Sequence, residues 1–241
     1  MERETLEFLW SILPSLLIGF PGHRPGGLAL TMLLAVAATV PGFAVALVVG
    51  TGRTSGNWPV RTICRAYVEI VRGTPLLLLL LVVYLFSGER RLGVDLSARA
   101  AALLALTLYS SAYQAEILRA GLAAVPEQLI ESARLMGGHG WQIFVRVRLP
   151  YAVQVMLPAL AGQIITMFKD SSVLVALGVG ELMTVARSVL GSDVSYVSYW
   201  LPTYLLVGGL YGVVAFGVSR AADRLERRRR SSDLLYSLAN Y

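Results

Sequence analysis

Residue types that carry much of protein chemistry are scarce in this chain of 241 residues. Its single cysteine, Cys64, excludes an internal disulfide and a metal cluster built on cysteines. The two histidines, His23 and His139, lie in glycine-rich turns without companion ligands, so we expect no metal site. No Gly-x4-Gly-Lys-Ser/Thr segment is present to hold the phosphates of ATP, and no catalytic group of side chains gathers on one segment. We therefore expect neither ATP hydrolysis nor a cofactor in this chain.

Charged residues are few as well. They make up 15% of the chain, against about 25% in soluble domains, while 56% is hydrophobic and the mean hydropathy is +0.64. A hydrocarbon core of ~30 Å needs about 20 residues of helix, and the alternation of apolar and polar residues typical of strands is absent. The sequence therefore predicts an all-α bundle integral to a membrane. The long apolar runs are 28–50, 74–86 with the segment before it, 98–118, 150–190 and 198–218.

The basic residues indicate an orientation. All but one of the 21 are arginines, and they lie mainly at the ends of apolar runs, a placement that favours membrane orientation over nucleic-acid binding. Because Lys and Arg accumulate on the cytoplasmic side, segments 51–65 and 119–148 and the C-terminal tail are predicted to be cytoplasmic. The N-terminus and segment 87–97 are then external, although Arg90 and Arg91 oppose the rule there.

The apolar run 150–190 is long enough for two spans. Two spans here would make six in total and would place the arginines at 227–230 outside, so we predict about five. The fourth span then lies near 150–170, and 171–195 forms a shorter helix and loop that dips back from the external face.

The N-terminal apolar stretch 8–20 contains Pro14 and is too short to span comfortably, so we predict a helix that lies at the membrane interface. The expected organisation is an N-terminal interfacial segment (1–27), a transmembrane domain (28–220) whose cytoplasmic loop covers 120–150, and a cytoplasmic basic tail (221–241).

A polar, helix-forming segment lies between two of the apolar runs. Pro126 suits the first turn of a helix, where its missing N–H is not needed, and Glu127 suits the positive end of the helix dipole. The helix is predicted over 128–136, and it ends at Gly137 and Gly138, which permit left-handed backbone. Such a helix is too short and polar to span, but its apolar side chains suit a groove on a partner protein. The alternative is an ordinary loop helix packed on its own bundle.

Other residues stand at set spacings from this helix. The pattern E-A-A-x3-G-x9-I-x-L-P is met, with Ser132 for the first Ala and Val147 for the Ile. It resembles the cytoplasmic coupling loop of the permeases of ATP-binding-cassette (ABC) importers, in which the short helix seats in a cleft of a separate ATPase and transmits its closure. By that resemblance, the residues that dock on the ATPase are Glu131, Ser132, Ala133, Gly137, Leu149 and Pro150.

Three further segments resemble the branch of that family that imports polar amino acids. With the loop, the resemblance covers about residues 26–226. The segments are 67–77, with Arg-Gly-Thr-Pro at 72–75; 113–119, Tyr-Gln-Ala-Glu-Ile-Leu-Arg; and 169–174, which is similar to a K-D-T-S-L pattern.

Arg72 is a charge in the middle of an apolar segment, where it costs about 2.5 kcal/mol or more unless it is paired or faces water. The glycine and proline that follow it break the helix, and broken helices near the membrane midplane are where transporters bind solutes. We therefore expect Arg72, Gly73 and Thr74 to line the substrate pathway, with Arg72 on a carboxylate of the solute. The alternative is a structural ion pair with Glu69 or Asp170.

Lys169, Asp170 and Ser171 form a second polar group, at the end of the predicted fourth span. The two charges are adjacent and face different directions, so one can meet the solute while the other pairs. If Asp170 lines the pathway, it holds an ammonium group, which with an arginine on the carboxylate suits an α-amino acid. The alternative is a helix end whose charges both reach the interface.

Glu116 precedes Arg119 by three residues, which places both on one helix face. The sequence predicts a structural ion pair between them at the cytoplasmic edge of the membrane.

The resemblance implies the permease subunit of an ATP-driven importer of a polar amino acid or close analogue, in the bacterial cytoplasmic (inner) membrane. It implies separate ATPase subunits that carry ATP and Mg, a second permease chain that is identical or related, and an extracytoplasmic substrate-binding protein. Lipid surrounds the chain, and no nucleic acid is expected. The alternative is a secondary transporter or channel for a small polar solute, from which no ATPase would co-elute.

Overall fold

A computed structural model describes residues 2–20, 25–87 and 96–239, and the side chains of these from residue 3 to residue 224. The described residues are helical apart from short connections and contain no strand, as the sequence predicted; Gly27 and Glu181 form an isolated bridge. The predictions on His23, Arg90 and Arg91 lie outside the described residues.

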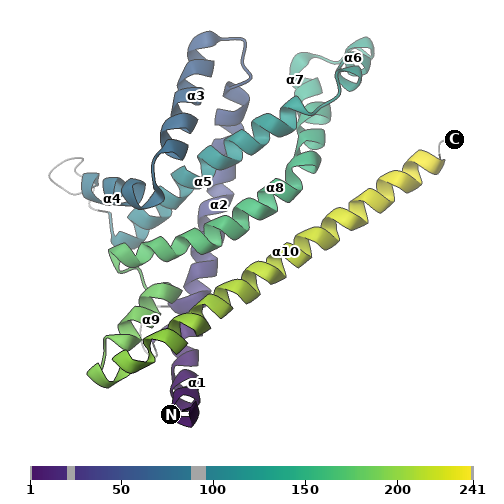
Figure 1. Cartoon of the computed structure of the whole chain (residues 1–241). Coiled ribbons are helices and arrows are strands. Elements are labelled where there is room, and N and C mark those ends of the chain that lie inside the picture. The colour runs from purple at the N-terminus through teal and green to yellow at the C-terminus, as the bar shows by residue number, and fades with distance from the viewer. Residues whose placement is uncertain (1, 21–24, 88–95, 240–241) are drawn as a thin grey trace.

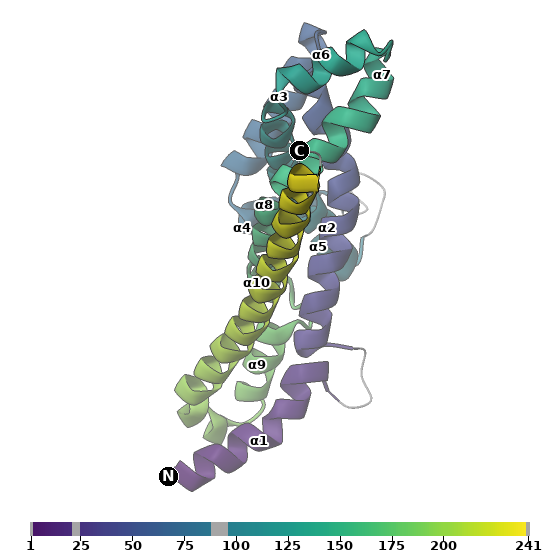
Figure 2. The ribbon, with the colours of Figure 1, turned by 90° about the vertical axis from the view of Figure 1, so that its right-hand side faces the viewer.

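The long helices run beside one another, inclined to the long axis of the molecule (Figure 1). Helices α1 and α9 lie at one end, the α9 end, and α6 and α7 lie at the other, the α6 end; a quarter turn shows the same separation (Figure 2). The helices are α1 (Glu2–Ile18), α2 (Gly27–Gly52), α3 (Trp58–Gly73), α4 (Leu76–Phe86), α5 (Ala98–Ala123), α6 (Glu127–Leu135), α7 (Gly140–Ile143), α8 (Leu149–Asp170), α9 (Leu182–Leu190) and α10 (Trp200–Ala239), with a π-helical turn η1 (Phe144–Arg148) and the 3-10 turns η2 (Ser171–Leu177) and η3 (Val194–Tyr199).

Helix α5 is the centre of the bundle and packs on α2, α3, α4 and α8. The approach of α2 is close: a Cβ atom on Gly50 would lie 2.9 Å from the Leu118 side chain, as small residues allow in membrane helix pairs. Because α5 faces protein more than lipid, it can bury Ser110, Ser111 and Gln114, and the Gln114 amide donates to the Ser110 hydroxyl at 2.8 Å.

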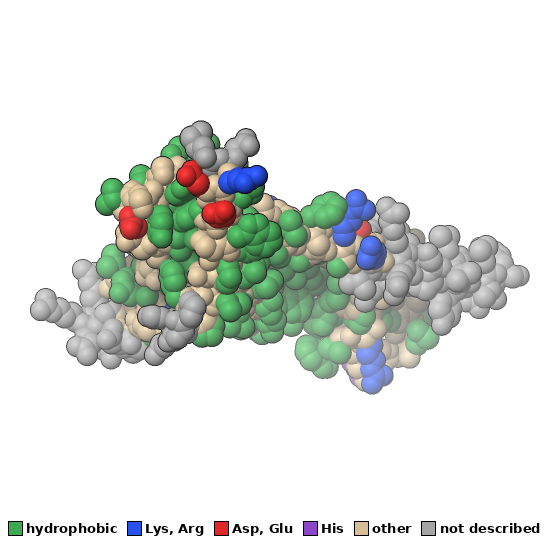
Figure 3. All heavy atoms as spheres, turned by 90° about the horizontal axis from the view of Figure 1, so that it is seen from below, with side chains coloured by type: hydrophobic (Ala, Val, Ile, Leu, Met, Phe, Trp, Pro, Cys, Tyr) green, Lys and Arg blue, Asp and Glu red, His purple; other side chains and the backbone are tan. Residues whose placement is uncertain are grey.

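Three helical stretches of the described chain, 27–52, 140–177 and 194–224, are long and apolar enough to cross a membrane, and α3 with α4 makes a fourth if this bent pair is one span. Hydrophobic side chains cover much of the described surface seen from the α9 end (Figure 3), which suits a lipid environment. The polar helix α5 is not among these stretches, so five spans remain a prediction.

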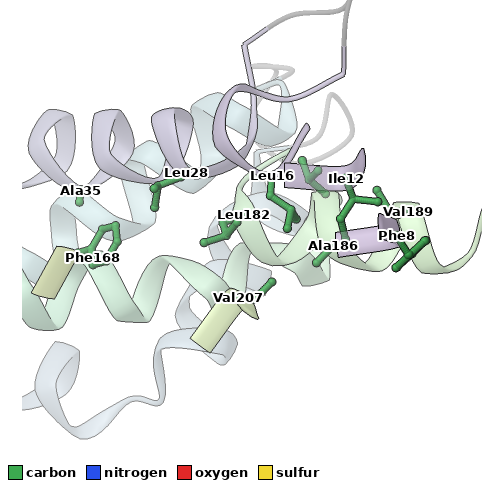
Figure 4. Close-up of a cluster of buried hydrophobic side chains, with 11 residues drawn as sticks. Phe8, Ile12, Leu16, Leu28, Ala35, Phe168, Leu182, Ala186, Val189 and Val207 are labelled. Carbon is green, nitrogen blue, oxygen red and sulfur yellow. The ribbon is translucent and has the colours of Figure 1, made fainter. Parts of the chain in front are cut away.

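The α9 end contains a hydrophobic cluster built on α1 and α9. Figure 4 shows the side chains of one α1 face directed toward α9. The spacing of four residues places these α1 side chains on one helix face, so the N-terminal helix is packed on the bundle, and its position at a membrane interface remains a prediction. The contributing residues are Phe8, Ile12 and Leu16 of α1 and Leu182, Val185, Ala186 and Val189 of α9, with Leu28, Ala35, Phe168 and Val207 from α2, α8 and α10.

The region 150–190 divides where the sequence predicted. Helix α8 ends at Asp170, the turn η2 follows, and α9 is a separate short helix. The predicted fourth span, near 150–170, corresponds to α8, whose first turn contains Pro150; helical backbone also precedes it, so that the helical stretch runs from Gly140 to Leu177. The π-helical turn η1 lies directly before Pro150, and such a widened turn accommodates the proline ring, which lacks an N–H and crowds the preceding carbonyl groups.

Helix α10 is a single helix from Trp200 to Ala239. The predicted boundary between the transmembrane domain and the tail, at residues 220 and 221, falls inside it. The division into three segments therefore remains a prediction.

Candidate functional site

The first part of the site is the break between α3 and α4. The two helix axes meet at 108°, and the residues between them are Thr74 and Pro75. The Thr74 N–H donates to the Val71 carbonyl at 3.3 Å, and its hydroxyl donates to the Ile70 carbonyl at 2.7 Å. Thr74 thus closes α3 with its own polar groups, and the proline after it has no N–H to satisfy.

Arg72 lies just before this break and faces α5. Its guanidinium carbon is 5.1 Å from the centre of the Tyr113 ring, and Nη1 is 3.8 Å from Oε2 of Glu116. The alternative prediction, a structural ion pair, is met with a different partner, because Arg72 pairs with Glu116 and not with the predicted Glu69 or Asp170. Glu69 accepts a hydrogen bond at 2.7 Å from Nε of Arg65, on the exposed side of α3. Arg72, at the end of α3, faces α5 instead.

Glu116 lies at the centre of a charged cluster and accepts hydrogen bonds from two arginines. Its Oε1 accepts hydrogen bonds from Nε and Nη2 of Arg119 at 3.0 and 2.7 Å, so the predicted ion pair is confirmed. Its Oε2 accepts a hydrogen bond from Arg53, which follows the end of α2. One carboxylate therefore joins guanidinium groups from α2 and α5 and lies near a third from α3. The sequence analysis did not find Arg53, because 63 residues separate it from Glu116.

Two tyrosines connect this cluster to the end of α8. The Tyr109 hydroxyl donates to the Tyr113 hydroxyl at 3.2 Å, and the ring centres are 4.8 Å apart. Asp170 is the last residue of α8, and α8 packs on α5. Sequence reasoning assigned no role to either tyrosine, although the spacing of Tyr109, Tyr113 and Glu116 (i, i+4, i+7) already places them on one helix face.

We call this arrangement the polar face of α5. Its side chains are all partly accessible, and it includes two of the predicted pathway residues: Arg72, which contacts Tyr113, and Asp170, at the end of the helix that packs on α5. The polar face consists of Tyr109, Tyr113 and Glu116 of α5 with Arg72 of α3 and Asp170 of α8.

The other predicted pathway residues lie in different settings. Gly73 is exposed at the break, and Lys169 is exposed on α8. Ser171 is fully buried, and its hydroxyl donates to the Phe168 carbonyl at 2.7 Å. Ser171 therefore supports the turn after α8, and its hydroxyl is not presented to the polar face.

The second part of the site is α6, at the opposite end from α9. The predicted helix 128–136 is found one residue earlier, at Glu127–Leu135, with Pro126 as the N-terminal cap. Gly137 adopts a positive φ of 81°, the left-handed conformation predicted to end this helix.

The side chains of this segment divide into a packed set and an open set. Ile130 and Ala133 are buried on the protein's own bundle, with Leu149 packed at the edge of the same cluster. Leu135 and Met136 are 90% and 82% exposed. The open set includes the predicted docking residues Glu131, Ser132, Gly137 and Pro150, and Trp141, which the sequence analysis did not single out.

Within the described part of the chain, no group of three or more His, Cys, Asp or Glu residues is placed to hold a metal ion. The side chains that meet at the polar face offer ion pairing and hydrogen bonding, and the open side chains of α6 offer apolar contact.

Comparisons with known proteins agree on one kind of molecule. Residues 42–231 match the family model described as "Binding-protein-dependent transport system inner membrane component". The chain is 31% identical over 228 residues to the probable glutamine ABC transporter permease protein GlnP of Bacillus subtilis, covering 95% of this chain and 96% of that protein. It is 30% identical over 207 residues to the arginine transport system permease protein ArtQ of Bacillus subtilis, covering 86% and 92%. A crystal structure of an amino acid ABC transporter with histidines superposes with a TM-score of 0.77 at 27% identity, covering 94% of this chain and 97% of that one.

Proposed function

The chain belongs to the family of binding-protein-dependent transport system inner membrane components, and from that premise we propose that it carries a polar amino acid across the cytoplasmic membrane along the polar face of α5. It is a permease subunit of an ATP-driven importer with a fold like that of type I ABC importers, and the ATPase is a separate subunit in such systems. Its partners are accordingly an ATPase and a binding protein.

The contacts of the Arg72 guanidinium are the main support for this solute site. Its guanidinium stacks on the Tyr113 ring and donates no hydrogen bond to a described residue, since Glu116 is 3.8 Å away and already holds two other arginines. A planar guanidinium with free N–H groups suits bidentate binding of a carboxylate. Asp170, across the two tyrosines, accepts no hydrogen bond from a described residue and suits the ammonium group.

The names of relatives support an amino-acid solute, because the two Bacillus subtilis permeases are named for glutamine and arginine. Transporters bind solutes near broken helices, and Arg72 lies directly before the α3–α4 break, which supports the assignment.

Helix α6 is proposed as the coupling helix. Glu131, Ser132 and Gly137 are open for contact, and Ala133 and Leu149 join the helix to the bundle. This division suits the transmission of motion. The open side of α6 contacts the ATPase, and the buried side passes the movement of α6 on to α5 and α8.

The proposed orientation places the α6 end and the C-terminus in the cytoplasm, and the N-terminus and the α9 end outside, where a substrate-binding protein would dock. The proposal includes five spans, α1 at the membrane interface, a basic tail over 221–241, and a second permease chain, the same or related, that completes the pathway.

A reconstituted transporter tests the solute site. The permease, its ATPase and its binding protein in proteoliposomes should lose amino-acid uptake on Arg72→Ala while the complex still assembles on size-exclusion chromatography. Arg65→Ala removes an exposed arginine from the same helix and should leave uptake unchanged. Full uptake by the Arg72→Ala variant would refute the assignment.

A further inference from the structure

The polar face offers a ligand two carboxylates, and one of them is already taken. Glu116 accepts two hydrogen bonds from Arg119 and one from Arg53, and Arg72 is 3.8 Å away. A carboxylate has about four acceptor sites on its two oxygens, and three of those on Glu116 are filled. A cationic ligand would therefore find at most one open site on Glu116, next to three guanidinium groups that repel it.

The aromatic rings of the face are partly covered by other side chains. A cation can also bind over an aromatic ring, but Arg72 covers a face of Tyr113. The Tyr109 ring packs against Tyr113 at 4.8 Å with an interplanar angle of 45°. Of the two carboxylates, Asp170 is the one that accepts no hydrogen bond from a described residue, and the cationic Lys169 is its neighbour on α8.

The nearest other buried acid serves a different purpose. Glu181 accepts hydrogen bonds from the N–H groups of Met183 and Thr184 and from the hydroxyls of Thr184 and Tyr211. These four donors come from α9 and α10, so Glu181 is engaged in holding the α9 end together.

Resting on the proposed function, we infer that this permease accepts amino acids with neutral or acidic side chains and excludes those with a cationic side chain. Every α-amino acid needs an anionic partner for its ammonium group, and an amino acid with a cationic side chain needs a second anionic partner for that side chain. The polar face supplies one free carboxylate, and it carries three guanidinium groups in and around it, which repel a further cation.

Arg53 and Arg119 determine this selectivity without contacting the solute, because they keep Glu116 occupied. Replacing one of them by glutamine frees part of the Glu116 carboxylate. The variant should then bind cationic amino acids better, which a purely structural role of the arginines would not produce.

Binding to the purified permease–ATPase complex in nanodiscs, without the binding protein, tests the inference directly. Radiolabelled glutamine is displaced by unlabelled glutamine, glutamate, arginine or lysine. We expect arginine and lysine to compete at least about tenfold more weakly than glutamine and glutamate. In the Arg119→Gln variant, this difference in competition between cationic and other amino acids should shrink several-fold, because the cationic amino acids bind more tightly. If Arg119→Gln does not assemble, Arg53→Gln replaces it. Arg65→Gln, in an exposed pair with Glu69, is the matched control, and its competition by the four amino acids should equal that of the native complex.

The outcomes separate the two proposals. Equal competition by arginine and glutamine in the native complex overturns the exclusion of cations while the proposed function stands. No improvement for cationic amino acids in assembled Arg119→Gln and Arg53→Gln overturns the role of these arginines. If radiolabelled glutamine does not bind, and radiolabelled glutamate, arginine and lysine do not bind either, the proposed solute class itself is overturned.

Discussion

The carboxylate of Glu181, at the start of α9, accepts a hydrogen bond from the hydroxyl of Tyr211 in α10 at 3.0 Å. Glu181 is fully buried, and it also caps α9 by accepting from the N–H groups of Met183 and Thr184. One residue on, the Leu182 N–H donates to the Thr31 hydroxyl of α2 at 3.0 Å. A short helix with little surface of its own is thus held between two long helices by polar contacts made in a buried setting.

Substitutions at this contact should lower stability in a graded manner. Tyr211→Phe removes one hydrogen bond and should reduce the free energy of unfolding by about 0.5–1.5 kcal/mol. Glu181→Ala also removes the helix cap, which adds about 0.5–2 kcal/mol. Thermal unfolding in nanodiscs measures both, with Tyr84→Phe on the exposed side of α4 as the control. A Glu181→Ala variant as stable as the native protein would contradict the assignment.

Gly137 should be required for its backbone conformation. An alanine Cβ there would meet nothing within 4 Å, but φ is 81°, and an L-residue in this region costs about 1–2 kcal/mol. Gly137→Ala should therefore fray the end of α6 and reduce stimulation of the ATPase by the binding protein. Gly140→Ala is the matched control, since its Cβ also meets nothing within 4 Å and its φ is not positive. Equal ATPase stimulation in the two variants would mean that the end of α6 is not part of the coupling.

The open apolar side chains of α6 should matter for assembly rather than for folding. Leu135 is 90% exposed, so Leu135→Asp should leave the melting temperature of the isolated permease nearly unchanged. A charge inside an apolar contact is costly, so the ATPase should be lost during co-purification. Gln128→Asp, an exposed position of the same helix, should retain the ATPase. Retention by both variants would place the contact elsewhere.

Removing the charge of Glu116 should destabilise the bundle. Glu116→Gln leaves Arg53 and Arg119 without their anion, and the cost should be about 1–3 kcal/mol, less than the 3–5 kcal/mol of a fully buried pair, because the Glu116 side chain is 26% exposed. Glu69→Gln breaks a pair in which both side chains are more than half exposed, and it should cost at most about 1 kcal/mol. Thermal unfolding of the two variants in the same lipid compares them. Equal melting temperatures would show that the cluster contributes nothing to stability.

Some parts of the site could be predicted because their causes are local. The break after Arg72 follows from a glycine and a proline in sequence, and the end of α6 follows from Gly137, whose backbone freedom needs no tertiary contact. The pair of Glu116 with Arg119 follows from a spacing of three residues on one helix.

Other parts required contacts between segments far apart in the chain. Nothing near Arg72 in sequence indicates that Glu69 turns away to Arg65 while Tyr113 and Glu116 approach from α5. The π-helical turn η1, which leads directly into α8, likewise has no signal in the local sequence.

The sequence alone determined that this chain is a helical membrane protein, where its helices break, and which family it resembles, since apolar length, glycine and proline act through nearby backbone and through partition into lipid. The tertiary structure alone decided which charges meet. Arg53, Tyr109 and Tyr113 joined the site only when α2, α3, α5 and α8 packed together, because the strength of an ion pair or a ring contact depends on distance in space and not on separation along the chain.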